Sequence, residues 1–227
     1  PYNHNQAYLA GGGLSGGNHL FHLTAGNSSI SYIEEPYSFN STISAMGYSH
    51  LDPTHRYVLT YYGSFYHSSD DGNNWQLSSA FDGPDAHYFY GSTIWESQST
   101  SGTVIIGGSG YSNPPVYISY NHGESFIPLN EDLPNTLVYE LTGTPDDAYF
   151  FAATEVGPYV YITEEGTWQD LAGISAPDQT YWSVEYIPEL NTARFGTYGR
   201  GIWDFIIDES VNIPGDINFD ETVNIQD

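Results

Sequence analysis

The chain has 227 residues, of which 39% are hydrophobic, so it is long enough to bury a core in one large all-β domain or two small ones. Three basic residues stand against 28 acidic ones, for a formal net charge of -25. Because phosphate binding requires clustered cations, this charge argues against a nucleic-acid partner. Cysteine is absent, which rules out disulfides, and no apolar run approaches the ~18 residues of a membrane-spanning helix. The chain opens at Pro1 without an initiator methionine, so we expect it to be a piece of a longer protein.

Five segments share one pattern, a β-rich run followed by a glycine-containing turn and a second alternating run, which predicts a β-hairpin. They cover residues 7–24, 56–69, 103–120, 148–163 and 193–207. The turn glycines lie 51, 47, 47 and 42 residues apart, at Gly12, Gly63, Gly110, Gly157 and Gly199. Such spacing is typical of the four-stranded blades of a β-propeller.

Four of the hairpins are preceded by a further candidate strand, within residues 41–53, 87–97, 136–147 and 181–190. Each blade would then consist of an inner strand, a hairpin and an outer strand. The sequence therefore predicts an all-β fold over residues 1–207, a β-propeller with about four to five blades present. An incomplete ring would expose sheet edges and apolar faces, so we expect further blades from the same longer chain or from a neighbouring subunit.

Three turns after these hairpins repeat a second motif: a small hydroxyl residue, Asp or Asn, glycine and an aromatic residue. The copies begin at "SSDDGNNW" (68), "SYNHGESF" (119) and the shorter "TEEGTW" (163). The motif residues are Ser68, Asp70, Gly72 and Trp75; Ser119, Asn121, Gly123 and Phe126; and Thr163, Gly166 and Trp168. Side chains at the first two positions can bond backbone amides, glycine tolerates positive φ, and the aromatic ring can anchor the hairpin. We therefore expect a structural role for these residues.

The pattern Ser-x-Asp-x-Gly-x-x-Trp resembles the Asp-box, or bacterial neuraminidase repeat, of sialidase, xyloglucanase and sortilin-type propellers. The resemblance covers residues 1 to about 207. It implies a secreted or cell-surface multidomain bacterial protein whose Asp-boxes lie at the blade periphery, away from the central channel.

The end of the chain has a different composition, with a linker over 208–215 and then acidic and amide residues at alternate positions. Positions 1, 3, 5, 7, 9 and 12 of this segment are Asp216, Asn218, Asp220, Thr222, Asn224 and Asp227, which is the ligand spacing of an EF-hand calcium loop. The segment resembles the first loop of a dockerin repeat, which implies Ca²⁺ as a cofactor. It departs from that pattern at Glu221, where glycine is usual and a side chain would strain the turn.

Catalytic candidates are few. Sialidases that this chain resembles hold their substrate with three arginines, but Arg56, Arg194 and Arg200 are the only arginines, and their positions do not favour convergence. Glu96, Glu140 and Glu185 recur near similar points of the predicted inner strands and could form a ring that binds a cation or a sugar. Solvated carboxylates lining a channel are the simpler interpretation.

Histidines and aromatic residues give further hints. His19 and His22 would face opposite sides of a strand, which argues against a joint zinc site. The other histidines considered are scattered near turns, at His50, His55, His67, His87 and His122. Aromatic residues concentrate in "YYGSFYH", "HYFY" and "TYWSVEY", where they could stack on sugars or fill the core between blades.

The function expected from these observations is a non-catalytic extracellular or cell-surface module for binding or structural assembly. A glycan or a surface protein is the candidate ligand, and membrane insertion is not expected. The alternative is a glycoside hydrolase or sialidase-like propeller enzyme whose catalytic residues lie partly outside this chain.

Overall fold

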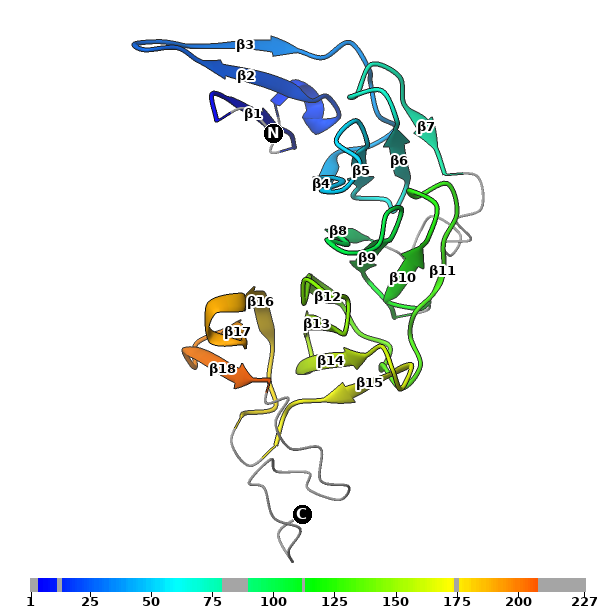
Figure 1. Ribbon diagram of the computed structural model, residues 1–227, viewed down its shortest axis with the longest axis vertical. Coiled ribbons are helices and arrows are strands. Elements are labelled where there is room, and N and C mark those ends of the chain that lie inside the picture. Colours follow the sequence, from blue (N-terminus) through cyan, green and yellow to red (C-terminus); the bar gives the residue numbers. More distant parts are fainter. Residues whose placement is uncertain (1–3, 12–13, 79–89, 112, 174–175, 208–227) are drawn as a thin grey trace, which may run out of the picture.

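The computed structural model describes residues 4–11, 14–78, 90–111, 113–173 and 176–207. These form five antiparallel sheets, each an up-and-down meander in chain order. Figure 1 shows the sheets side by side in an open arc, with β4, β8 and β12 on its inner side and β7, β11 and β15 on its outer side. The chain is therefore a partial β-propeller, and the predicted all-β fold is confirmed.

The three middle sheets each have four strands, and the first and fifth have three. The first sheet contains β1 (Gln6–Leu9), β2 (Phe21–Ala25) and β3 (Ile30–Glu34). The second contains β4 (Ile43–Tyr48), β5 (Arg56–Thr60), β6 (Phe65–Ser68) and β7 (Gln76–Leu77). The third contains β8 (Gly91–Glu96), β9 (Val104–Gly108), β10 (Val116–Ser119) and β11 (Ile127–Pro128).

The fourth sheet contains β12 (Val138–Gly143), β13 (Tyr149–Thr154), β14 (Pro158–Ile162) and β15 (Thr167–Asp170). The fifth contains β16 (Tyr181–Ile187), β17 (Thr192–Thr197) and β18 (Ile202–Ile206). Two short 3-10 turns, Leu14–Gly17 and Pro188–Leu190, are the helical elements of the described residues. Neither has the length and apolar character needed to cross a membrane.

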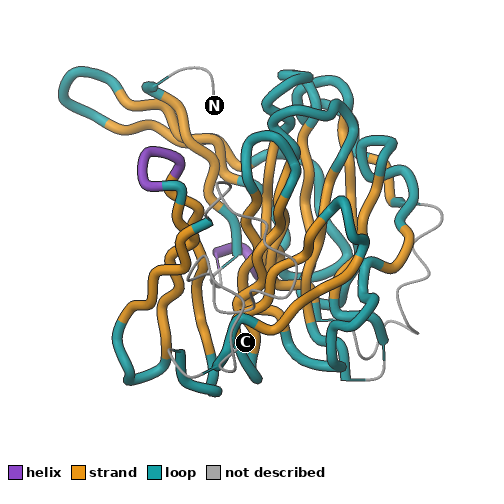
Figure 2. Tube along the Cα trace, turned by 60° about the horizontal axis from the view of Figure 1, so that its bottom comes forward, coloured by secondary structure: helices purple, strands orange, loops and turns teal. Residues whose placement is uncertain are grey.

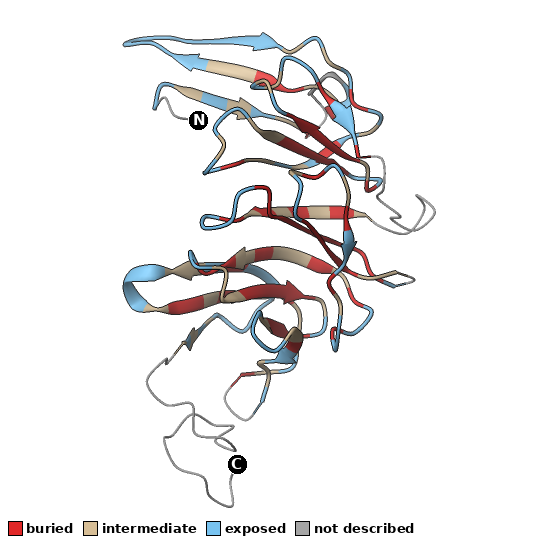
Figure 3. Ribbon diagram, turned by 45° about the vertical axis from the view of Figure 1, so that its right-hand side comes forward, coloured by how far each residue is buried: buried red, intermediate tan, exposed pale blue. Residues whose placement is uncertain are grey.

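The core lies between neighbouring sheets. Middle strands such as β9, with the sequence VIIGG, are buried along their whole length, because a sheet packs against each of their faces. Four apolar clusters fill the four boundaries between adjacent sheets. Figure 3 shows this burial in the middle sheets, whereas the β2–β3 hairpin is largely exposed. Each middle blade is thus stabilised by its two neighbours.

Close approach of two blades requires a glycine at Gly143 on β12. A Cβ atom there would lie 2.6 Å from the Trp95 ring of the preceding sheet and 2.8 Å from Phe150. A side chain at this position would therefore push the third and fourth sheets apart.

Each inner strand carries a β-bulge near its start, a regularity not predicted from the sequence. The pairing register skips one residue in β4, β8, β12 and β16. The skipped residues are Ser44, Ser92, Tyr139 and Trp182. Bulges bend a strand and redirect its side chains, so these four residues occupy equivalent places in successive blades.

The turns at the two ends of each blade connect different pairs of strands. In a four-stranded meander, the turn between the second and third strands lies at the same end as the connection to the next blade. The turns after the first and third strands lie at the opposite end. Figure 2 shows the loops gathered at both ends of the strands. The predicted linker at 208–215 and the predicted calcium loop at 216–227 lie outside the described residues.

Candidate functional site

The first Asp-box turn joins β6 to β7 and is held by its own side chains. Ser68 Oγ accepts a hydrogen bond from the backbone N–H of Gly72 (3.0 Å) and donates one to Asp70 Oδ1 (2.8 Å). The same Asp70 oxygen accepts from the backbone N–H of Asn74 at 2.8 Å. Gly72 has φ of +88°. Hydrogen bonds from Asn74 lower the pKa of Asp70. This carboxylate therefore stabilises the turn and is unsuited to donate a proton.

The second copy, between β10 and β11, repeats the geometry with an amide in place of the carboxylate. Ser119 Oγ accepts from the Gly123 N–H (2.9 Å), and Asn121 Oδ1 accepts from the Ser125 N–H (3.0 Å). Asparagine supplies the same acceptor oxygen as aspartate, so a charge is not needed at this position.

The third copy, between β14 and β15, is one residue shorter and closes differently. The backbone N–H of Gly166 donates to Ile162 O at 2.8 Å, and the Thr163 hydroxyl donates to Asp147 O at 2.6 Å. The hydroxyl here ties the turn to the neighbouring turn of its own blade.

The aromatic residues of the three turns are buried between blades. Trp75, Phe126 and Trp168 each lie in the apolar cluster shared by their own sheet and the preceding one. Trp168 is 2% exposed, and its Nε1 donates to Leu129 O at 2.9 Å. The motif therefore fastens one blade to another in addition to closing a turn.

The three candidate glutamates do not occupy equivalent blade positions, so the predicted ring is not formed. Counted from the bulge of its own strand, Glu140 is the first residue, Glu185 the third and Glu96 the fourth. The three glutamates have similar places in the predicted inner strands, so the sequence did not reveal that they lie at different distances from the bulges.

Glu96 lies inside the boundary between the second and third sheets. Its Oε1 is buried, and a Cβ atom added to Gly47 on β4 would sit 1.4 Å from that oxygen. Burial raises the pKa of Glu96 to about 8, against the opposing effect of the Tyr48 backbone hydrogen bond. The carboxyl is therefore a neutral packing group at pH 7.

Glu140 and Glu185 do share a cavity, of about 460 Å³, between β12 and β16. Glu140 Oε2 accepts a hydrogen bond from the Val184 N–H at 3.0 Å. Burial, and to a lesser extent the charge of Glu185, raise the pKa of Glu140. Of the three candidates, this pair alone offers two carboxyl groups to one space.

The arginines do not converge. Arg56 on β5 forms an ion pair with Asp71 in the second sheet. Arg194 on β17 forms a two-pronged pair with Asp204, with both N–O distances 2.7 Å, and Arg200 lies in the same fifth sheet. Two whole sheets separate Arg56 from the others, so a substrate-binding triad is not formed within this chain.

Seven aromatic side chains gather at the end of the blades opposite the Asp-box turns. They lie in turns between second and third strands, in the segment that leads into β8, and at two of the bulges. We call this surface the aromatic face; its residues are Tyr61, Tyr62, Tyr90, Tyr111, Tyr139, Trp182 and Tyr198.

Rings of the aromatic face contact one another both within a blade and across blade boundaries. Tyr61 and Tyr90 have ring centroids 4.9 Å apart. Tyr139 and Trp182, the bulge residues of neighbouring blades, are 4.3 Å apart, and Trp182 is 6.2 Å from Tyr198. Trp182 is nevertheless 49% exposed and Tyr198 75% exposed. The rings are thus held in place while their surfaces remain open.

Polar groups and a cavity lie beside the rings of the aromatic face. The phenol of Tyr111 donates a hydrogen bond to Glu155, an interaction that raises the pKa of Tyr111 to about 12. A cavity of about 320 Å³ opens between Tyr61, Tyr111 and Tyr139. Flat apolar surfaces rimmed by hydroxyl and carboxylate groups suit ligands that combine an apolar face with many hydroxyls, as sugars do.

Solved structures with the same fold include enzymes and a peptide-binding protein. The Niastella koreensis GH74 enzyme matches with a TM-score of 0.68 and 17% identity, over 90% of this chain and 35% of that one. The GH74 xyloglucanase from Xanthomonas campestris matches with a TM-score of 0.66 and 13% identity, over 91% and 36%. YCF48, solved bound to D1 peptide, matches with a TM-score of 0.62 and 10% identity, over 89% and 60%.

These likenesses define the chain as a partial β-propeller related in fold to Asp-box-type propellers. It spans about a third of the length of the two GH74 chains. No protein-family model matches the sequence, and none of the curated proteins does.

Glu96 gives a pH test of the blade boundary. Its folded pKa of about 8 exceeds the ordinary value of 4.5, so the folded chain binds more protons between these two pH values. Its contribution to stability is therefore fully present below pH 4.5 and is lost as pH rises towards 8. We expect Glu96→Gln, measured by urea unfolding, to gain stability over the wild type as pH rises from 5 to 9.

A matched control is Glu189→Gln, which changes an exposed carboxyl in a surface turn. Parallel stability profiles for wild type and Glu96→Gln over this range would contradict a buried, neutral Glu96.

Proposed function

We propose that the chain is a non-catalytic propeller module that binds a polysaccharide on the aromatic face. The observation that carries the proposal is two groups of packed rings at the same end of the blades, one containing Tyr61 and the other containing Trp182 and Tyr198. Many aromatic side chains elsewhere in these sheets are buried between blades, such as Phe65 and Tyr181, whereas Tyr32 and Tyr120 are exposed singly outside the aromatic face. Exposed apolar rings gathered on one surface favour a binding role.

The net charge of the chain limits the class of ligand that it can bind. With a net charge of -25, the surface repels anionic polymers and is compatible with neutral ones. A neutral glycan chain can stack on the rings and accept or donate hydrogen bonds at the Tyr111–Glu155 pair. Xyloglucan is a suitable first probe, because xyloglucanases share this fold, although a likeness at 13% identity concerns the fold alone.

An extracellular location is part of the same proposal. The low content of basic residues and the resemblance to Asp-box propellers of secreted proteins support it. Other blades, from the longer protein or a neighbouring subunit, would complete the ring and extend the aromatic face.

A glycoside hydrolase remains the second candidate because Glu140 and Glu185 share one cavity. Two carboxyl groups that face one space are what glycosidases use as acid and as base or nucleophile. In that case, the substrate would have to enter the groove between β12 and β16, and Glu140→Gln would abolish hydrolysis.

Binding can be measured by calorimetry with soluble xyloglucan and other neutral glucans and mannans. We expect Trp182→Ala to weaken binding about tenfold or more, equivalent to ~1.4 kcal/mol. Tyr32→Ala is the matched control, because Tyr32 is 71% exposed but lies on β3, outside the aromatic face. Equal affinity in both variants would contradict the proposal, and hydrolysis that Glu140→Gln abolishes would favour the enzyme.

We further propose that Asp216 to Asp227 forms a calcium loop in the intact protein, on the strength of its ligand spacing. Calorimetry on the complete protein should show Ca²⁺ uptake that Asp216→Ala abolishes. Uptake unchanged by that substitution would contradict the assignment.

A further inference from the structure

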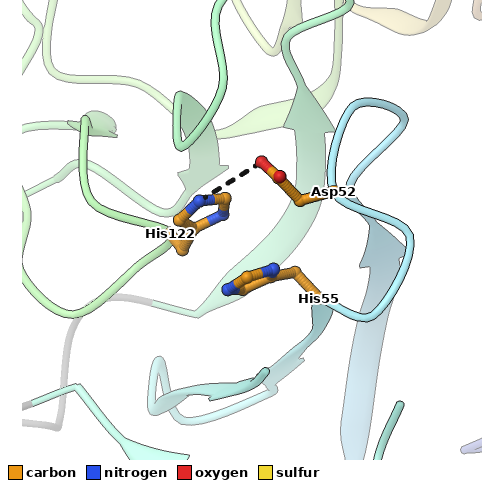
Figure 4. A group of neighbouring side chains, drawn as sticks. All are labelled: Asp52, His55 and His122. Carbon is orange, nitrogen blue, oxygen red and sulfur yellow. Dashed lines mark ion pairs between the residues drawn. The ribbon is translucent and has the colours of Figure 1, made fainter. Parts of the chain in front are cut away.

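A histidine pair and an aspartate meet on the Asp-box side of the propeller, at the boundary between the second and third sheets. Asp52 and His55 belong to the turn between β4 and β5, and His122 belongs to the Asp-box turn after β10. Figure 4 shows the three side chains facing one another. The interpretation of these histidines as scattered is therefore wrong for His55 and His122, because blade packing brings their turns together.

The distances suit a shared cation. One potential ligand atom from each residue lies within 4.8 Å of the others, the one such group of three in the described part of the chain. His122 Nε2 and Asp52 Oδ2 are 3.4 Å apart. Two ligand atoms at ~2.0–2.1 Å from a tetrahedral Zn²⁺ are themselves about 3.4 Å apart. This pair is already spaced as the edge of such a coordination sphere.

The other nitrogen of His122 has a buried partner. The Tyr57 hydroxyl lies 2.9 Å from His122 Nδ1, and Tyr57 is 1% exposed. If Nδ1–H donates to the phenol oxygen, the lone pair of Nε2 is directed at the Asp52 carboxylate. Two acceptors that face each other repel unless a proton or a cation lies between them. Ligating histidines are commonly oriented by such a partner on their second nitrogen.

The backbone fixes the turns that carry these side chains. The His55 N–H donates to Asp52 O at 2.9 Å, and the His122 N–H donates to Gly102 O at 2.9 Å. Ser101 donates its hydroxyl to Asp52 Oδ2. The site is thus built from three turns of two blades, and its Asp52–His122 pair is already in place.

His55 supplies an unused nitrogen. Its Nδ1 is buried without a hydrogen-bond partner, and its ring stacks on that of His122 at 3.8 Å between centroids. The nitrogen lone pairs of two stacked rings lie in parallel planes and do not converge on one point. The His55 ring must therefore tilt away from the His122 ring for both to bind the same metal ion.

We propose that Asp52, His55 and His122 bind one divalent transition-metal ion of the zinc class, with water as the remaining ligand. Two imidazoles and one carboxylate are a set that zinc accepts and that calcium, which requires six to eight oxygens, does not. The ion would fasten the second blade to the third at the periphery, and the acidic chain would raise the local cation concentration.

The test is calorimetric titration of the protein with ZnCl₂ in saturating CaCl₂, which occupies oxygen-only sites such as the proposed loop at 216–227. We expect one zinc site per chain in the wild type, lost in His122→Ala and in Asp52→Asn. Tyr57→Phe, which removes only the positioning hydroxyl, should weaken zinc binding about 10- to 100-fold. Co²⁺ in place of Zn²⁺ should give the visible absorption of a tetrahedral site in the wild type, and this absorption should be lost in His122→Ala and in Asp52→Asn.

His50→Ala is the matched control, because His50 lies in the same turn but is exposed and packs on Tyr48. It should retain the site. Thermal melts without metal check that each variant is folded, and His55→Asn replaces any variant that is not. Absence of zinc binding by the wild type, or equal zinc affinity in His50→Ala and a folded His122→Ala or His55→Asn, would overturn the proposal.

Discussion

Face-to-face packing of neighbouring sheets is the constraint on which the rest of this structure depends. The largest fully buried side chains, among them Tyr57, Phe151 and Phe195, lie in clusters that two adjacent sheets share. A single four-stranded sheet is too small to bury such residues alone. The three middle blades are covered on both faces, whereas the outermost ones leave large apolar residues open, for example Ile30 at 70% and Ile206 at 75% exposed. A partial ring with two unfinished ends is the result.

The alternation of turns in each meander then divides function between the two ends of the blades. The Asp-box turns and the turns after the inner strands stabilise the blades and the contacts between them. Ser68 and Ser119 close their own turns. Trp168 donates a hydrogen bond to the preceding blade, and Asp52 lies beside His122 across a blade boundary. The opposite end presents open rings, and contacts such as Tyr139 with Trp182 and Tyr111 with Glu155 link neighbouring blades there as well.

Much of the fold was predictable because its signals are local. Turn glycines, alternating runs and the three Asp-box motifs are each contained within about ten residues, and their repetition revealed the blades. Features that depend on pairing register or on contacts between blades were not predictable. Glu96, Glu140 and Glu185 lie at different distances from the bulges of their strands, and the positions of the bulges are set by strand pairing. His55 and His122 met only through packing. "YYGSFYH" contains both exposed Tyr61 and fully buried Phe65, because the chain turns between them.

Native-state hydrogen exchange of the backbone amides tests most directly whether contacts between blades, and not the sheets themselves, stabilise this chain. Amides of β9 and β13 in the middle sheets should exchange slowest, close to the rate set by global unfolding. Amides of β2 and β17, although each is the central strand of a sheet, should exchange much faster because their sheets are covered on one face. Equal protection of the central strands in all five sheets would show that each sheet is stable on its own, and would contradict the account.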